Sequence, residues 1–259
     1  MVFTLITGAG KGIGKALANE CALRGMNVLL VSNDSTCLHS VCEELRLKKI
    51  ECHYLDLDLT DDDAPSKVSQ WVAQNNFKVN MLINNVGVGK GGMFGTMNIS
   101  DMLYMMKLNN KVLVELTYRL LPELKQHARS FILNLSSLEA TLPLPYKAVY
   151  TATKNFVYAF SLAIAEELKP SNVGVSVVCP GPVLTNAEGF SRMNAHGARS
   201  KILMMYPEPV ARIALDGLLK GKRIIVPGFL NAVFFKLGSL LPVEIKMRLL
   251  EKLFRVYRT

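Results

Sequence analysis

Short apolar segments alternate with longer amphipathic ones along most of the 259-residue chain. The short segments are mostly continuous apolar runs, which is typical of parallel strands that are buried on both faces. They predict strands over Phe3–Thr7, Val28–Ser32, Glu51–Leu55, Val79–Asn84, Ser130–Ser136, Val173–Cys179 and Arg223–Val226. The intervening segments predict helices near residues 13–25, 35–48, 64–75, 101–127, 148–169 and 207–220. This repetition indicates an α/β fold, with a doubly wound parallel sheet flanked by helices.

Two segments interrupt the alternation. Residues 183–206 are a long, polar, Met-containing stretch, and residues 228–259 are an apolar and basic C-terminal extension. No linker, internal repeat or low-complexity tract divides the chain, so we expect one Rossmann-type domain. Its dinucleotide-binding catalytic part would span residues 1–227, with residues 228–259 packed on the same domain.

The charge of the chain is unevenly distributed. The net charge is +9, and the region from Arg199 to Thr259 has 12 Lys and Arg against 4 Asp and Glu. No aromatic–basic interleaving accompanies this charge, so we expect no nucleic-acid partner. The chain opens directly into the first apolar strand with no signal-peptide pattern, and no apolar run approaches the roughly 18 residues of a spanning helix. We therefore expect a cytoplasmic protein, with membrane association left open by the basic extension.

The five cysteines form no C-x-x-C pair, and their odd number favours reduced thiols over a disulfide framework. Cys37, Cys42 and Cys52 lie near His39 and His53 in the sequence. Their spacing matches no standard zinc-ligand pattern. Buried free thiols are the better interpretation, and we expect no metal site.

The first predicted strand runs into a glycine-rich turn that contains Gly8, Gly12 and Gly14, and a helix follows at once. In this position glycines allow a tight turn and a close approach of the backbone to a pyrophosphate. The helix N-terminus then offers free N–H groups and a positive dipole to the anion. The glycine spacing resembles the T-G-x-x-x-G-I-G loop of the short-chain dehydrogenase/reductase family.

Tyr150 and Lys154 are four residues apart on a predicted helix, so both side chains lie on one face. A neighbouring ammonium favours the phenolate and lowers the pKa of tyrosine toward a value useful for acid–base catalysis. The pair resembles the Y-x-x-x-K motif of the same family. The resemblance implies that Tyr150 transfers the proton and that Lys154 holds the nicotinamide ribose.

Two further residues complete the catalytic set that the resemblance implies. Ser137 lies thirteen residues before Tyr150, just past a strand, and would hydrogen-bond the substrate oxygen; Ser136 is the alternative. Asn109 matches the helix asparagine that anchors a water in the proton relay, with Asn110 beside it as the alternative.

The remaining motifs concern the cofactor. Residues 84–87 resemble the N-N-A-G segment beside the adenosine site, and residues 180–185 resemble the P-G-x-V-x-T turn that lines the nicotinamide. The resemblance, which runs from Val2 to Val226, implies cofactor contacts by Gly8, Lys11, Gly12, Ile13, Gly14, Ser32, Asn33, Asp58, Asn85, Gly87, Tyr150, Lys154, Pro180, Val183 and Thr185.

The choice of nicotinamide is read at the end of the second strand, where NAD enzymes place an acidic residue that would repel a 2′-phosphate. The matching residue is the neutral Ser32, followed by Asn33. Lys11 in the glycine loop is placed to meet a 2′-phosphate, whereas Asp34 argues the other way. These residues favour NADP(H) over NAD(H).

The resemblance therefore implies an NADP(H)-dependent oxidoreductase that interconverts a ketone and a secondary alcohol. The substrate loop contains Met193, Met204 and Met205, which is consistent with a hydrophobic acyl, steroid-like or retinoid-like substrate. Packing of the loop itself is the alternative role of these methionines. A homo-oligomer, dimer or tetramer, is also implied. The rival hypothesis is a nucleotide-binding scaffold or sensor with little turnover, against which the complete catalytic set argues.

The C-terminal extension predicts a basic amphipathic helix within residues 242–258. Its apolar stripe consists of Leu249, Leu250, Leu253, Phe254 and Tyr257. Such a helix can make peripheral contact with an anionic membrane. It can equally pack on a neighbouring subunit or cover the substrate cavity, so the sequence leaves three hypotheses open.

Overall fold

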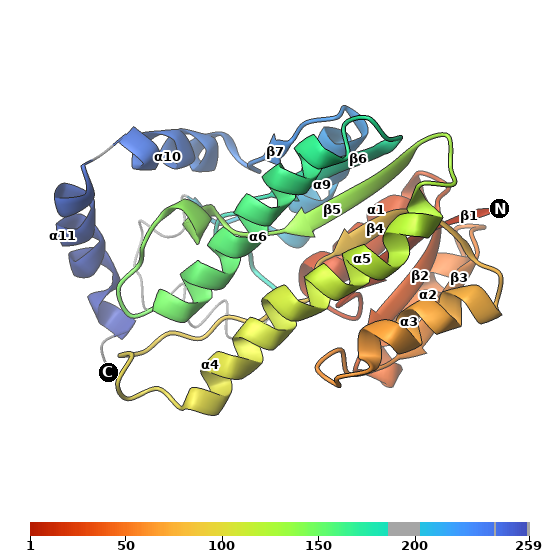
Figure 1. Ribbon diagram of the computed structural model, residues 1–259, viewed down its shortest axis with the longest axis horizontal. Coiled ribbons are helices and arrows are strands. Elements are labelled where there is room, and N and C mark those ends of the chain that lie inside the picture. The colour runs from red at the N-terminus through yellow and green to blue at the C-terminus, as the bar shows by residue number, and fades with distance from the viewer. Residues whose placement is uncertain (186–202, 241, 258–259) are drawn as a thin grey trace.

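Seven parallel strands form a single sheet between two layers of helices in a computed structural model of the chain, which describes residues 1–185, 203–240 and 242–257 (Figure 1). The strands are β1 Val2–Thr7, β2 Asn27–Ser32, β3 Cys52–Asp56, β4 Lys78–Asn84, β5 Ser130–Leu135, β6 Val173–Val178 and β7 Ile224–Ile225. Their order in the sheet is β3-β2-β1-β4-β5-β6-β7. The predicted doubly wound α/β domain is confirmed.

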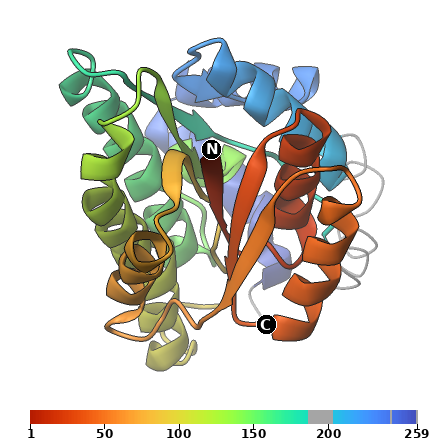
Figure 2. The ribbon, with the colours of Figure 1, turned by 90° about the vertical axis from the view of Figure 1, so that its right-hand side faces the viewer.

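Helices cover both faces of the sheet, as Figure 2 shows. The helices are α1 Gly12–Leu23, α2 Ser35–Arg46, α3 Ala64–Gln74, α4 Ile99–Met106, α5 Val112–Leu124, α6 Ala148–Glu167, α9 Pro207–Leu219, α10 Phe229–Leu240 and α11 Val243–Phe254. One buried apolar cluster joins the sheet to α1, α2 and α9, and a second joins it to α3 and α5. Because both faces are covered, the central strands are almost entirely apolar, as the sequence pattern predicted.

The predicted helix near residues 101–127 is interrupted in the structure. α4 begins after Asn98, whose side chain accepts a hydrogen bond from the Ser100 N–H. A π-helical turn, Lys107–Lys111, separates α4 from α5. Such turns are frequent at functional sites, and this one contains Asn109.

The strand order places the candidate site. β1 and β4 are neighbours at the centre of the sheet, and from them the chain winds outward in opposite directions. In open parallel sheets, ligands bind outside the carboxyl ends of the strands at this switch point. The glycine loop after β1, the 85–89 loop after β4 and Ser136–Ser137 after β5 all lie at that edge.

The C-terminal extension forms α10, α11 and a short 3-10 turn, Arg255–Tyr257, at one end of the molecule (Figure 1). The predicted apolar stripe is divided between two faces. Leu250 is buried against Leu142 and Leu144 with Phe254 beside it, whereas Leu249 and Leu253 are more than half exposed. Across the described ranges, every helix falls short of the length and apolarity that crossing a bilayer demands.

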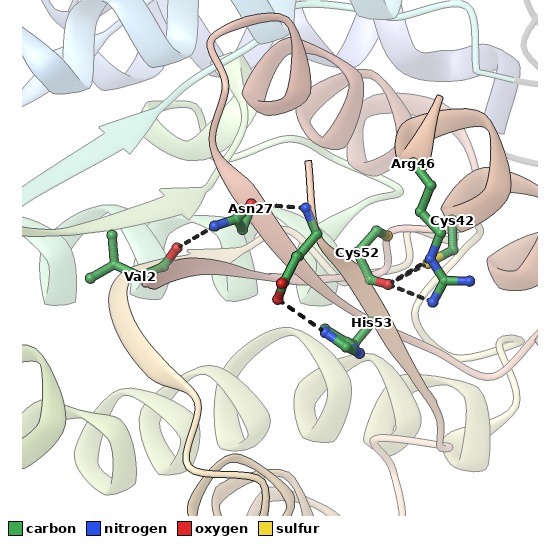
Figure 3. Close-up of polar contacts among 7 residues, drawn as sticks. Val2, Asn27, Cys42, Arg46, Cys52 and His53 are labelled. Carbon is green, nitrogen blue, oxygen red and sulfur yellow. Dashed lines mark hydrogen bonds and ion pairs between the residues drawn. The ribbon is translucent and has the colours of Figure 1, made fainter. Parts of the chain in front are cut away.

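The cysteine- and histidine-containing region after β2 is held by ordinary polar contacts (Figure 3). The Cys42 thiol donates to the Cys52 carbonyl at 2.9 Å, and the Arg46 guanidinium donates to the same oxygen. His53 lies 3.7 Å from a carboxylate oxygen of Glu51. The five cysteines are free. The residues that the structure describes contain no group of His, Cys, Asp and Glu side chains suited to a metal ion.

Candidate active site

The start of α1 has the features of an anion-binding helix terminus. Its N-cap residue, Lys11, is extended and makes no side-chain cap, and the first turn contains no acidic residue. The N–H groups of this turn are therefore left for a ligand, and the helix dipole favours a negative one. Gly14 packs tightly on Gly8, and Ile13 packs against the apolar core. The terminus fits a dinucleotide pyrophosphate.

The adenosine side of the site contains an ion pair that the sequence did not predict. The Lys11 Nζ lies 2.8 Å from an Asp34 carboxylate oxygen, and Asp34 also caps α2 by accepting the Cys37 N–H. Hydrogen bonding to Lys11 lowers the pKa of Asp34 well below its usual range. Ser32 is half-buried beside Gly10, and Asn33 is exposed. Lys11 would have to exchange Asp34 for a 2′-phosphate, or share its charge between them.

Asn85 and Asp58 hold the loops on either side of the adenosine region. The Asn85 side chain donates to the carbonyl oxygens of Thr7 at 2.8 Å and Gly8 at 3.1 Å, which ties the end of β4 to the glycine loop. The Asp58 carboxylate accepts both the N–H and the hydroxyl of Thr60, and these bonds lower its pKa. Asp58 therefore remains ionised and fixes its own turn.

Lys154 is buried below the carboxyl ends of β5 and β6. Its ammonium donates to the Leu135 carbonyl at 3.0 Å, and the buried Cys179 lies nearby. Burial lowers the pKa of Lys154 to about 8, whereas burial raises the pKa of the Cys179 thiol to about 12. Lys154 therefore carries its charge at neutral pH, beside an uncharged thiol.

The structure separates the two candidate serines by their contacts. The Ser136 hydroxyl donates to the Lys154 carbonyl at 2.7 Å, so it holds α6 against β5. The Ser137 hydroxyl accepts the Glu139 N–H at 3.1 Å and begins the 3-10 turn Leu138–Thr141. Its own proton is available for another acceptor, which is what an oxyanion contact would need.

One loop after β4 touches three of the four candidate catalytic side chains. A Cβ at Gly87 would lie 2.9 Å from the Asn109 Oδ1 and 3.2 Å from the Lys154 Nζ. A Cβ at Gly89 would lie 2.8 Å from the Tyr150 ring. Asn109, Tyr150 and Lys154 therefore converge on this loop, and only residues without a side chain fit against them.

Asn109 fixes the position of that loop. Its Oδ1 accepts the Val88 N–H, and its Nδ2 donates to the Val88 carbonyl, both at 2.9 Å. The Nδ2 also donates to the Thr153 hydroxyl, while Asn110 donates to the Thr153 carbonyl. Asn109 thus faces the site, whereas Asn110 binds the backbone of α6, and Thr153 is a contact that the sequence did not reveal.

The segment after β6 closes the other side of the site. The Pro180 carbonyl accepts the Leu138 N–H, and Val183 forms a parallel bridge with Met205. The Thr185 side chain lies against Gly12 at the start of α1. Of the methionines expected in the substrate loop, Met193 lies outside the described residues.

Lys147, which the sequence did not single out, lies between the active-site helix and the C-terminal turn. Its ammonium pairs with Glu139 at 2.9 Å and lies 5.8 Å from the centre of the Tyr150 ring. It also lies 5.2 Å from the Phe254 ring and 4.7 Å from the Tyr257 ring. Phe254 and Tyr257 lie more than 100 residues after Lys147, so no local sequence motif indicates their contacts with it.

A dinucleotide-type helix terminus and a Ser-Tyr-Lys set at the switch point of a parallel sheet define a nicotinamide-dependent dehydrogenase or reductase. The model of the short chain dehydrogenase family matches residues 3–195. The chain belongs to the short-chain dehydrogenase/reductase family.

The chain is similar in sequence to named reductases and dehydrogenases. The chain is 31% identical over 188 residues to the very-long-chain 3-oxoacyl-CoA reductase of Homo sapiens, covering 71% of this chain and 60% of that protein. It is 33% identical over 195 residues to human 17-beta-hydroxysteroid dehydrogenase type 3, covering 74% and 62%. The chain thus spans about three fifths of the length of these relatives.

Solved structures share the whole fold. A 7beta-hydroxysteroid dehydrogenase structure superposes with a TM-score of 0.86 at 21% identity, covering 96% of both chains. A short-chain dehydrogenase from Sphingobium yanoikuyae in complex with NADPH has a TM-score of 0.80 at 25% identity, covering 93% of this chain and 97% of that one. A family member from Burkholderia phymatum in complex with NAD has a TM-score of 0.83 at 21% identity, covering 95% of both.

Proposed function

We propose that the chain is an NADP(H)-dependent oxidoreductase that interconverts a ketone and a secondary alcohol on a hydrophobic substrate. The observation that carries this proposal is the convergence of Tyr150, Lys154 and Asn109 on the 87–89 loop. Ser137 lies at the end of the strand whose Leu135 carbonyl holds Lys154. A scaffold without turnover would not need these proton-transfer groups together.

In the reductive direction, Tyr150 gives its proton to the developing alkoxide, and the Ser137 hydroxyl donates a hydrogen bond to the same oxygen. The Lys154 ammonium stabilises the phenolate that Tyr150 becomes, and its remaining N–H groups hold the ribose. Asn109 positions the loop and a water that returns the proton from solvent. When bound, the nicotinamide supplies or accepts the hydride.

The hydrophobic substrate class has two supports. Two aromatic side chains, Phe254 and Tyr257, lie near Tyr150, because all three rings surround the Lys147 ammonium. Two relatives are named for a very-long-chain 3-oxoacyl-CoA and for a 17-beta-hydroxysteroid. The very long acyl chain and the steroid skeleton in these names are both large apolar groups that bear a reactive oxygen.

A screen of ketones graded by size and polarity tests this function, with NADPH consumption as the readout. We expect turnover at pH 7, where Lys154 is still protonated because its pKa is about 8. Rates should rise from small polar ketones to bulky apolar ones. NADPH fluorescence that reports binding, combined with no oxidation by any ketone, would instead support a nucleotide sensor.

The preference for NADP(H) rests on Lys11, and its removal gives a separate prediction. We expect Lys11→Ala to weaken NADPH binding about twofold to fivefold, because an exposed charge pair contributes little binding free energy. NADH binding should change less than twofold, because NADH has no 2′-phosphate. Titration of cofactor fluorescence measures both, with Lys15→Ala as the control for lost positive charge near the loop. Equal losses for both cofactors would contradict this assignment.

We also propose that the chain forms a homo-oligomer and contacts a membrane peripherally through its C-terminal helix. Exposed apolar side chains on α4, α5 and α6 support the oligomer, namely Ile99, Leu103, Met106, Tyr118 and Phe156. The basic charge of the C-terminal region supports the membrane contact.

A further inference from the structure

Each of the last two helices exposes several apolar side chains. On α10 the exposed side chains are Phe229, Leu230, Val233, Phe234 and Leu237. On α11 they are Val243, Ile245, Leu249 and Leu253. Apolar side chains gathered on the exposed face of a helix favour an interaction site, because single exposed apolar residues are ordinary but groups of them are not.

α10 is anchored by one face and exposes the other. Asn231 is buried and donates to the carbonyls of Leu203 and Pro227, and Phe235 packs edge-on against Tyr158. At 100° per residue, the five exposed apolar residues lie on the side opposite these two anchors. Phe229 is 82% exposed and Leu237 is 58% exposed. Phe229 and Leu237 are therefore mainly exposed to solvent, whereas Val233 and Phe234 at 38% and 37% are partly covered.

α11 has the same division, with a charge pattern added. Its inner face places Leu250 in an apolar cluster, and Tyr146 donates to Glu251 at 3.1 Å. Ile245, Leu249 and Leu253 are exposed and follow one another at intervals of four residues, so they form a stripe along the helix. At helical spacing, basic residues flank this stripe: Lys246 on one side, Arg248 and Lys252 on the other.

Two of the positive charges around the stripe are not paired with a described acidic residue. Among the residues that the structure describes, neither Arg248 nor Lys252 has an ion-pair partner, whereas Glu251 pairs with Arg255. The wider region from Arg199 to Thr259 has 12 basic residues against 4 acidic ones. A two-fold contact of this surface with itself would bring like charges together, which is unfavourable. An anionic lipid surface complements both the apolar stripe and its basic flanks.

We propose that α10 and α11 together form a docking surface for an anionic membrane, with α10 and the Ile245–Leu249–Leu253 stripe entering the interface and Arg248 and Lys252 contacting lipid headgroups. This deepens, and rests on, the membrane contact proposed above. Because the inner face of α11 touches Lys147 beside Tyr150, the rim of the active site lies next to the bilayer.

Vesicle co-sedimentation of the full chain tests this surface. We expect binding to vesicles of phosphatidylcholine with about one third phosphatidylserine, and weaker binding to phosphatidylcholine alone. Leu249→Asp/Leu253→Asp and Phe229→Ser/Leu237→Ser should each reduce binding at least tenfold. Leu47→Asp is the matched control, because Leu47 is 85% exposed at the end of α2.

A charge reversal separates the electrostatic part of the interaction. Arg248→Glu/Lys252→Glu should remove the preference for phosphatidylserine, whereas Lys48→Glu/Lys125→Glu should keep it. NADPH turnover of a soluble ketone, measured without vesicles, should be unchanged in every variant. This turnover tests the catalytic function alone, whereas vesicle binding tests the lipid-binding surface alone. Equal vesicle binding by Leu249→Asp/Leu253→Asp and Leu47→Asp would overturn the proposal. A second result would also overturn it: no vesicle binding by the parent chain, together with loss of an oligomer in Leu249→Asp/Leu253→Asp. That result would assign this surface to contact with a second copy of the chain.

Discussion

Tyr150→Phe should lower the turnover of any ketone substrate about 10²–10⁴-fold, the usual contribution of a general acid. The ring remains, so its contacts with Gly89 and Lys147 are kept, and the hydroxyl is lost together with its transferable proton. NADPH binding, measured by its fluorescence, should stay within about twofold of the parent chain, because Lys154 and the glycine loop are unchanged.

Tyr158→Phe is the matched control for this prediction. Tyr158 lies on the same helix, α6, two turns further on, and its ring packs against Phe235. The same hydroxyl is removed there without touching the site, so turnover should remain close to that of the parent. If Tyr150→Phe kept near-normal rates with every active ketone, the acid would have to be another group.

Among the glycines that the structure describes, Gly14 is the one at which a single added methyl should be most disruptive. A Cβ at Gly14 would lie 2.0 Å from the Gly8 carbonyl oxygen and 2.6 Å from the Asn85 Nδ2. Backbone cannot yield as a flexible side chain does, so α1 would have to move away from β1. We expect a loss of about 3 kcal/mol or more in the free energy of unfolding, and a melting temperature about 6–12 °C lower. NADPH binding should be lost with the displaced loop.

Gly10→Ala provides the comparison within the same loop. A Cβ there would meet its nearest neighbour, the Cys37 Cβ, at 3.4 Å, which is close to ordinary contact. Thermal unfolding without cofactor should therefore be nearly unchanged. Equal destabilisation by both substitutions would mean that the loop tolerates no side chain anywhere, and that the close packing of Gly14 on Gly8 is not the cause.

The parallel sheet and the alternation of strands and helices along the chain could be predicted, because buried parallel strands leave continuous apolar runs in the sequence. Boundaries moved by one or two residues, as at β3 and β7, where the predicted strands began one residue early. The π-helical turn that contains Asn109 left no signal, because no proline or glycine marks it. α10 was missed because its sequence is apolar on nearly all sides and so lacks a helical period.

The candidate site could be predicted where its residues belong to local motifs, as with the glycine loop and the Tyr150–Lys154 pair. Contacts between distant segments could not be predicted. The Lys11–Asp34 pair depends on how two separate loops meet beyond β1 and β2. The division of the C-terminal stripe into an inner and an outer face depends on where Leu142 and Leu144 lie.

The attachment of α11 also has a consequence for local stability. Its contacts include one small apolar cluster, a hydrogen bond from Tyr146 and the rings around Lys147. Segments with few buried contacts open at free energies well below that of global unfolding. Tyr150 and Lys154 belong to the cooperative core, so the last helix can detach and rebind while the catalytic geometry persists.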